Sequence, residues 1–162
     1  MKTCKSPLSF GLAILCAAII LGVAVCSDAQ TVTPLANFNK QDGYDPSSGP
    51  LIQGVDGNFY GTTPIGGATI VDDVGAGNVF QLSPSGELRS IYSFCSQPNC
   101  SDGKFPFWGP VLATDGNLYG VVPDGGSYAG STYGSGTFYK LTVGGKFTLL
   151  YTFCATLSLI HI

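Results

Sequence analysis

The sequence has few charged residues and a single histidine. Only 10% of its 162 residues are charged, the net charge is −3, and there is one tryptophan and one methionine. A chain this poor in lysine and arginine offers no basic surface, so we expect neither nucleic acid nor anionic lipid as a partner. Low charge together with 23 glycines also argues against a bundle of amphipathic helices.

The longest apolar run lies at the N-terminus. Two lysines precede an almost unbroken apolar stretch over residues 8–25, and Ser27 and Ala29 supply small residues at positions −3 and −1 of a cleavage site. This pattern is typical of a secretory signal peptide, which we predict over residues 1–29. The protein is then secreted or displayed at the cell surface. A membrane anchor is the alternative, because the apolar stretch approaches spanning length.

Export has a consequence for the cysteines. Cleavage would remove three of them and leave three in an oxidising compartment, where paired cysteines usually form disulfides; the remaining three are Cys95, Cys100 and Cys154. Pro98 and Asn99 can turn the chain between the first two, so we predict a Cys95–Cys100 disulfide. Cys154 is expected to be the first half of a further loop of this kind.

An internal repeat is the strongest pattern in the chain. Residues 56–94 align with residues 115–153 without a gap, at an offset of 59, and fourteen positions are identical. Leu35-Ala36-Asn37-Phe38 resembles the end of a preceding unit. A fixed period of this size is the signature of a repeat architecture.

Each unit is predicted to contain four short strands separated by glycine-rich turns. The Asp-Gly-Asn sequence between two apolar runs favours a hairpin, since glycine adopts the positive φ that the turn needs. We expect an all-β fold of four-stranded antiparallel units, arranged as blades of an incomplete β-propeller. A β-helix and a β-sandwich fit the period less well. The predicted strands cover residues 51–55, 59–63, 78–83 and 88–94, then 111–113, 118–122, 137–142 and 147–153.

Two finer expectations concern side chains. Strict alternation along the last strand of the first unit would place Leu88, Ser90, Tyr92 and Phe94 on one face. The recurring glycines are interpreted as turn residues throughout.

The repeat resembles a known family. Its pattern is D-G-N-[FL]-Y-G, then G-G, then G-x-G leading into an [FY]-x-L strand, and finally G-x-[LF] followed by Y-x-F. These motifs resemble the GloVer tandem repeat of exported bacterial proteins, over about residues 35–154. The resemblance implies a repeat-built β fold, a surface or extracellular location and a C-terminal anchor in the full-length protein. It implies no catalytic residues.

The repeat also suggests the organisation of the chain. After the signal peptide we expect a partial repeat and linker at 30–50, repeat unit 1 at 51–95, repeat unit 2 at 96–154 and a truncated end at 155–162. Residues 157–162 read Leu-Ser-Leu-Ile-His-Ile, which a transposase mosaic-end sequencing adapter would encode. We expect this tail to be adapter-derived, in which case His161 is not native.

The acidic residues are expected to shape turns. The structural turn residues are Asp56, Gly57 and Asn58 in the first unit and Asp115, Gly116 and Asn117 in the second. Asp42 and Asp102 are likewise equivalent. An active site is normally built once, so repetition favours a structural role, although a glycosidase needs only two suitably placed carboxylates. We therefore predict no catalytic, cofactor-binding or metal-binding residues, and no cofactor.

Two unrepeated features offer alternatives. Asp72 and Asp73 can contribute to a calcium site, although an exposed loop pair is the interpretation that we favour. Trp108 with Phe105, Phe107 and Tyr128 can form a platform for a sugar, although such aromatics more often pack between blades.

The sequence therefore predicts an exported, non-enzymatic β-repeat protein for surface binding or a structural role. Its partner is unknown, with a glycan or a cell-surface component as candidates. The alternative is a carbohydrate-active propeller enzyme whose catalytic residues lie in further repeats.

Overall fold

The computed structural model describes residues 31–46, 49–71, 73–126 and 134–153. The chain divides into two units, Met1–Thr33 and Pro34–Ile162, and every strand described below lies in the second. The predicted signal peptide, Cys154 and the predicted tail at 157–162 lie outside the described residues. Within the described part of the chain, no helix has both the length and the apolar character needed to cross a membrane.

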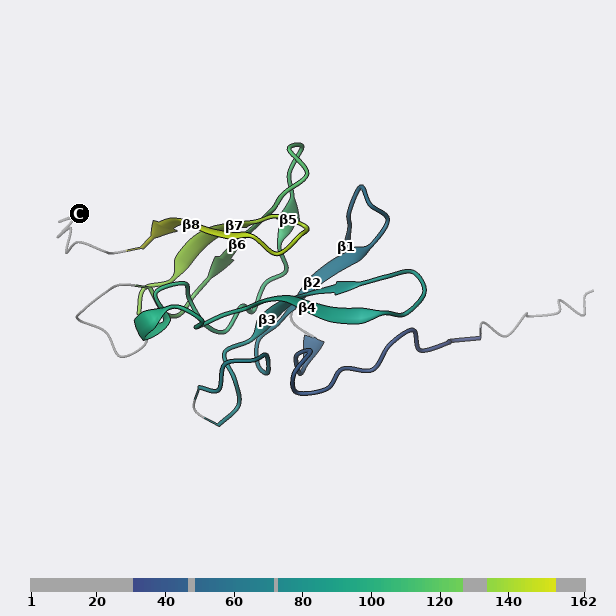
Figure 1. Cartoon of the computed structure of the whole chain (residues 1–162), viewed down its shortest axis with the longest axis horizontal. Coiled ribbons are helices and arrows are strands. Elements are labelled where there is room, and N and C mark those ends of the chain that lie inside the picture. Colours follow the sequence, from purple (N-terminus) through teal and green to yellow (C-terminus); the bar gives the residue numbers. More distant parts are fainter. Residues whose placement is uncertain (1–30, 47–48, 72, 127–133, 154–162) are drawn as a thin grey trace, which may run out of the picture. The chain divides into compact units, whose positions relative to one another are not determined.

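The first unit folds into a four-stranded antiparallel sheet (Figure 1). Its strands follow one another in space as they do in sequence: β1 (Ile52–Gln53), β2 (Phe59–Thr63), β3 (Asn78–Leu82) and β4 (Leu88–Ser93). The turn from β1 to β2 closes with a hydrogen bond from the Gly54 N–H to the Asn58 carbonyl, at 2.8 Å. Gly57 has a φ of 80°, the left-handed conformation that glycine adopts without steric cost.

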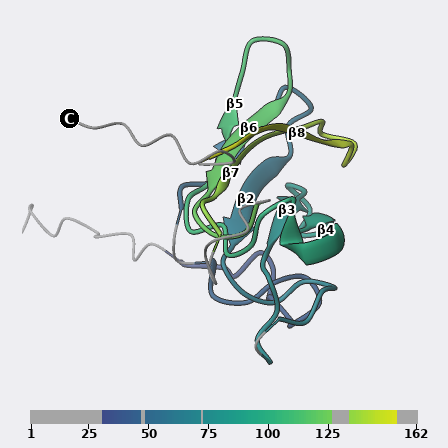
Figure 2. The same cartoon turned by 90° about the vertical axis from the view of Figure 1, so that its left-hand side faces the viewer.

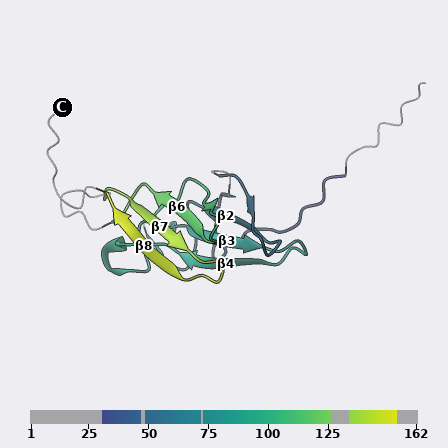
Figure 3. The ribbon, with the colours of Figure 1, turned by 90° about the horizontal axis from the view of Figure 1, so that it is seen from above.

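The second unit repeats this sheet strand for strand. It consists of β5 (Val111–Leu112), β6 (Leu118–Val122), β7 (Thr137–Leu141) and β8 (Phe147–Thr152), and Figure 3 shows β6, β7 and β8 side by side. Phe59 faces Leu82 in the first sheet and Leu118 faces Leu141 in the second, so the registers agree as well. The prediction of an all-β fold with two four-stranded antiparallel sheets is confirmed.

The outer strands are shorter than predicted. The expected strand at 51–55 is reduced to Ile52–Gln53 and that at 111–113 to Val111–Leu112. The chain turns earlier than the Asp-Gly pair suggests, because Gly54 already closes the turn by bonding to Asn58. Figure 2 shows the turn between β5 and β6 at the end of the hairpin that these two strands form.

The prediction of strict alternation along β4 is wrong. Phe80 faces Ser90 and Val79 faces Tyr92, so Ile91 is an extra residue, a β-bulge that moves Tyr92 to the opposite face from Leu88 and Ser90. The second sheet has the same shift at the equivalent place, where Tyr139 faces Leu149 and Phe138 faces Tyr151. In the first sheet, the bulge turns Tyr92 toward Phe147 of the second unit.

The interpretation of every recurring glycine as a turn residue is also wrong. Gly61 and Gly120 lie within β2 and β6, each directly opposite an aromatic residue of the next strand. A Cβ atom at Gly61 would lie 2.6 Å from the ring of Phe80, and one at Gly120 would lie 2.6 Å from the Cζ atom of Tyr139. Glycine is needed at both positions because the aromatic side chain opposite leaves no room for a Cβ atom.

The buried core lies between the two sheets. One face of the first sheet contributes Tyr60 and Val79, and the facing side of the second contributes Leu118, Tyr139 and Leu141, all of them buried. Phe94, just after β4, meets the Tyr139 ring edge-on at 5.3 Å, and Tyr92 stacks on Phe147 at 4.2 Å. Such ring pairs contribute about 0.5–1.5 kcal/mol each beyond their buried area.

The opposite face of the first sheet is covered in part by the segment before β1. The Phe38 ring meets the Phe80 ring edge-on at 4.9 Å, and Tyr44 bridges to Ile65. This contact reproduces the one between Phe94 and Tyr139, because Phe80 and Tyr139 are equivalent in the repeat. Residues 35–38 therefore occupy the place that the end of a preceding unit would take.

Candidate functional site

The two Asp-Gly-Asn turns place each aspartate at the centre of a small hydrogen-bonded cluster. The Asp56 carboxylate accepts bonds from the Asn58 backbone at 3.2 Å, the Asn58 side chain at 2.8 Å and the Tyr60 hydroxyl at 2.6 Å. Asp115 accepts the equivalent bonds from Asn117 and, at 2.9 Å, from Tyr119. The predicted turn residues thus lie together in both units.

The clusters differ in what the third strand adds. Gln81 donates to the Tyr60 hydroxyl at 2.6 Å in the first unit, whereas Lys140 pairs with Asp115 at 3.0 Å in the second. The hydrogen bond from Tyr60 lowers the pKa of the Asp56 carboxyl, and bonds from Asn117 and then Lys140 hold the pKa of Asp115 well below its usual value. Both carboxyls are therefore ionised acceptors at neutral pH, unsuited to donating a proton.

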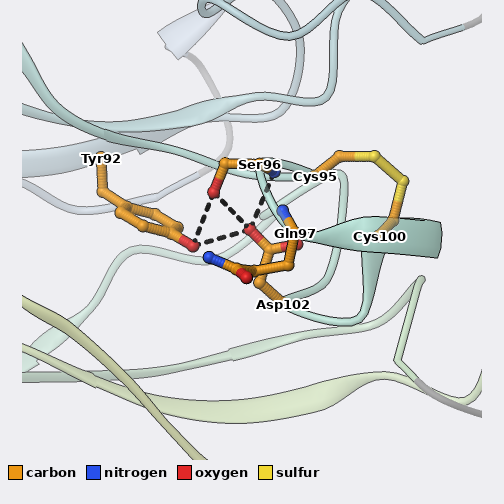
Figure 4. Close-up of a disulfide and its surroundings, with 6 residues drawn as sticks. All are labelled: Tyr92, Cys95, Ser96, Gln97, Cys100 and Asp102. Atoms are coloured by element: carbon orange, nitrogen blue, oxygen red, sulfur yellow. Dashed lines mark hydrogen bonds between the residues drawn. A yellow bond between two sulfur atoms is a disulfide. The ribbon is translucent and has the colours of Figure 1, made fainter.

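A second carboxylate cluster lies beside the disulfide, where Asp102 is buried (Figure 4). Its carboxylate accepts hydrogen bonds from the Tyr92 hydroxyl at 2.6 Å, from the backbone and hydroxyl of Ser96, both at 3.0 Å, and from the Gln97 backbone at 3.3 Å. Burial, and then the bond to Asp102, raises the pKa of the Tyr92 hydroxyl. Asp102 thus organises the loop between the two sheets.

The loop is closed by a disulfide between Cys95 and Cys100, the pair that the sequence predicts. A short 3₁₀ helix, η2 (Pro98–Cys100), forms the turn, and Asn99 adopts the left-handed conformation inside it. The equivalent loop before β1 has no cysteines; there the Asn39 side chain bonds to Asp42 instead. The same position in the repeat is thus closed in two chemical ways.

The unrepeated candidates lie only in part within the described residues. Asp72, Tyr128 and the residues opposite the Asp72-Asp73 pair lie outside the described residues, and Asp73 is exposed. Phe107 and Trp108 are both exposed, with their rings 6.4 Å apart at 71°, whereas Phe105 lies under the Lys104 ammonium group. Among the residues described, no three histidine, cysteine or acidic side chains are close enough together to hold a metal ion.

An apolar surface that sequence reasoning missed covers one face of the second sheet. We call it the β6–β8 face; it comprises Tyr119, Val121, Phe138, Tyr151 and Phe153, and Lys140 lies on the same face, beside Tyr119. Val121 is 42% exposed, Phe153 40% and Tyr151 58%. The alignment at an offset of 59 contains the signal, since it pairs each of these residues with one that is buried or half-buried in the first unit, but it does not show which unit has a neighbour.

A shallow apolar hollow of about 170 Å³ lies on the outer face of the first sheet. Its lining includes Phe38, Pro46, Leu51, Gly61, Phe80 and Leu82. We call this surface the β2–β3 face. Its Phe80 and Leu82 are the equivalents of Tyr139 and Leu141, which in the second sheet are buried against the first.

Comparison with known families identifies the repeat. A family model described as the Gloeobacter/Verrucomicrobia repeat matches residues 22–159, a span that contains both sheets. The comparison with curated proteins found no match.

Proposed function

The chain belongs to the Gloeobacter/Verrucomicrobia repeat family, and from this premise we propose that it is an exported, non-enzymatic β-repeat protein that acts in surface binding or as a structural module. Its sheets serve as blades of a β-propeller, stacked face to face. The core between the two sheets packs one face of the first sheet against the opposite face of the second, on a common topology, and this supports the arrangement.

The non-enzymatic proposal rests on the hydrogen bonding, pKa values and burial of the repeated carboxylates. Asp56 and Asp115 hold equivalent turns, and Asp102 holds a buried loop, each through several hydrogen bonds from neighbouring donors. A general acid needs a raised pKa and a general base needs access to substrate. The two turn carboxyls have lowered pKa values, and Asp102 is buried.

Export is supported by two independent features. The N-terminal sequence has the three parts of a signal peptide. The loop between the sheets holds a disulfide, and disulfides persist mainly in oxidising compartments. Fusing residues 1–29 to a reporter enzyme that is active only after export, and sequencing the N-terminus of the secreted product, tests this. A reporter retained in the cytoplasm would contradict it.

A glycan is the ligand class that the exposed aromatic pair favours. Phe107 and Trp108 lie in the connection between the sheets, and their rings are available for stacking on a sugar. A glycan array probed with the exported form tests binding, and Trp108→Ala should abolish it. Tyr44→Ala is the matched control, because Tyr44 is 55% exposed and Trp108 56%. A polysaccharide hydrolysis screen run in parallel tests the enzymatic alternative; turnover of any glycan would overturn the non-enzymatic proposal.

A further inference from the structure

The disulfide loop between the sheets holds both of its cysteines in an unfavourable backbone conformation. Cys95 has a φ of 58° and Cys100 a φ of 50°, in the left-handed region that few residues besides glycine, asparagine and aspartate adopt. Asn99, between them, has a φ of 57°. Three of the six non-glycine residues with a positive φ in the described part of the chain lie in this one loop, so backbone strain is concentrated at the disulfide.

The loop before β1 makes the equivalent turn without a disulfide. Three residues separate Phe38 from Asp42, whereas seven separate Phe94 from Asp102, so the disulfide loop is longer by four. The ends of the two loops correspond, because Phe38 packs on Phe80 as Phe94 packs on its own aromatic partner in the second sheet. The disulfide therefore closes an inserted segment and not the turn that both units share.

One hydrogen bond marks the shared turn in both units. The Gly67 N–H donates to the Lys40 carbonyl at 2.9 Å, and the Gly126 N–H donates to the Cys100 carbonyl at 2.9 Å. Lys40 accepts this bond without a positive φ, whereas Cys100 accepts it with one. The left-handed conformation of Cys100 thus comes with the disulfide-closed insertion, and opening the disulfide would allow it to relax.

The disulfide is accessible to a reductant. Cys95 and Cys100 are half-buried, and the four residues between them, 96–99, are all exposed. Thiol–disulfide exchange needs a path by which a thiolate can reach one of the two sulfurs, and this loop leaves one open. Strained or exposed disulfides are the labile ones, whereas structural disulfides resist reduction by glutathione.

The same loop connects the two sheets through Asp102. Its carboxylate accepts hydrogen bonds from Tyr92 of β4 and from Ser96 inside the loop (Figure 4), and its carbonyl accepts one from the Thr137 hydroxyl of β7 at 3.2 Å. The Cys100 carbonyl, two residues earlier, accepts bonds from the second unit as well. Opening the disulfide would therefore loosen a path of bonds that runs from β4 to β7.

We propose that the Cys95–Cys100 disulfide is a site of reversible thiol–disulfide exchange, strained by its left-handed cysteines and reduced by small-molecule thiols while the sheets stay folded. A thiolate attacks one cysteine sulfur, the S–S bond breaks, and the other cysteine leaves as a thiolate that takes up a proton. A second thiol resolves the mixed disulfide. Two thiols of the reductant thereby become one disulfide, and the protein gains two electrons and two protons. The redox state then sets how firmly the loop holds β4 to β7.

Equilibration of the exported form in a series of glutathione redox buffers tests the proposal. Cys154→Ser provides the background, because it removes the other cysteine of the exported form. Alkylation and mass spectrometry then count the free thiols. We expect the disulfide to be more than half reduced in an excess of reduced glutathione, with the circular dichroism of the sheets unchanged. A disulfide that stays intact at every ratio, or that opens only as the chain unfolds, would overturn the proposal.

Substitutions of Asn99 test the role of backbone strain. Asn99→Gly permits the left-handed conformation at no steric cost, whereas a β-branched residue opposes it, so Asn99→Val should be the more easily reduced. We expect the equilibrium constants for reduction by glutathione to differ by about tenfold between these two variants. Asn37→Val, at an exposed position outside the loop, is the matched control and should leave the constant unchanged. Equal constants for the two Asn99 variants would contradict the proposed strain.

Amide hydrogen exchange of the oxidised and reduced forms tests the conformational consequence. The Gly126 N–H should lose protection roughly tenfold or more on reduction, because its acceptor lies at the end of the opened loop. The Gly67 N–H, which makes the equivalent bond to Lys40, is the internal control and should keep its protection. Cys95→Ser with Cys100→Ser should reproduce the reduced pattern without any thiol.

Equal protection of Gly126 in the two redox states would show that the loop keeps its hold on β7 without the disulfide, and would overturn the proposed coupling. Export determines only the compartment in which the exchange takes place, and glycan binding and hydrolysis do not enter these readouts. The proposed function therefore stands or fails separately.

Discussion

The two sheets present equivalent residues to different surroundings. In the first, Tyr60, Val79 and Phe94 are buried against the second sheet; in the second, the equivalent Tyr119 and Phe138 are half-buried, and Phe153 is 40% exposed. Strand order and register are the same. Burial in a repeat protein is therefore set by the neighbouring unit, as the nearest-neighbour description of repeat stability requires.

The comparison also explains the composition. A unit that packs against neighbours on both faces has little surface for charged side chains, which fits a chain with only 10% charged residues. The comparison also explains why one pair of equivalent polar residues differs between the two units. Gln81, buried and bonded to Tyr60, is replaced by Lys140 on the more exposed face, where the ammonium group reaches Asp115.

The largest difference between the two faces should appear on truncating their equivalent phenylalanines. Phe94→Ala removes a fully buried ring from the core between the sheets and should lower the free energy of unfolding by about 3–5 kcal/mol. Phe153→Ala, at a ring that is 40% exposed, should cost less than about 1 kcal/mol. Chemical denaturation of both variants, at a concentration where the chain is monomeric, measures the difference. Equal losses would mean that the second face is buried in solution.

The second comparison sets the disulfide loop against the loop before β1. Cys95→Ser with Cys100→Ser opens a short covalent loop and should cost about 2 kcal/mol on the chain-entropy model. Asn39→Ala, which removes the hydrogen-bonded closure of the equivalent loop, should cost about 1 kcal/mol. Denaturation midpoints of the two variants test the ranking. A larger loss in Asn39→Ala would show that local bonds outweigh the covalent closure.

Much of the fold could be predicted because the repeat displays it twice. Asp-Gly-Asn turns, strand positions and the Cys95–Cys100 pair follow from local residue preferences, which act over a few positions and so are visible in sequence. The bulge at Ile91 could not be predicted in this way, because it depends on pairing between Val79 and Tyr92 across two strands. Alternation read along one strand does not detect an inserted residue.

The candidate surfaces were harder to predict than the fold. Gly61 resembles the turn glycines until its partner Phe80 is known, since the need for glycine comes from a ring on the adjacent strand. The sequence pairs Asp102 with Asp42, but the burial of Asp102 beside Tyr92 depends on the path of the disulfide loop. Which of two equivalent faces is exposed is a property of the neighbouring unit, not of the face's own residues.

The third prediction uses a residue that differs between the units only in its hydroxyl. Tyr139 is equivalent to Phe80, is fully buried, and its hydroxyl has no hydrogen-bond partner among the described residues. Tyr139→Phe should therefore raise the free energy of unfolding by about 1 kcal/mol. Tyr119→Phe, whose hydroxyl is bonded to Asp115, is the control and should not stabilise. A loss of stability in Tyr139→Phe would indicate that its hydroxyl has a partner.

Tyr139→Phe should also change how the free energy of unfolding depends on pH in the alkaline range. Burial raises the pKa of the Tyr139 hydroxyl above its usual value of 10.0 by disfavouring the ionised form, so stability does not depend on this titration below that pH and falls as the pH rises from 10.0 toward the folded-state pKa. Tyr139→Phe should weaken this dependence without removing it, because Tyr92 also has a raised pKa. Thermal unfolding followed from neutral pH to above pH 10 measures the slope.

The smallest expected effect separates the two turn carboxylates by their response to salt. Both have folded-state pKa values below the usual 3.8, so their contributions to stability are fully present above that pH and are lost as the pH falls through the folded-state values. The exposed ion pair with Lys140, which salt screens, causes part of the lowering of the Asp115 pKa. The pKa of Asp56 is lowered instead by hydrogen bonds from the neutral donors Tyr60 and Asn58, on which salt has little effect. The destabilisation caused by Asp115→Asn should therefore shrink as salt is added at neutral pH, while that caused by Asp56→Asn should stay constant. Melting temperatures of the two variants across a salt series would reveal this, and a parallel decline in both would show that Asp56 also acts through long-range charge.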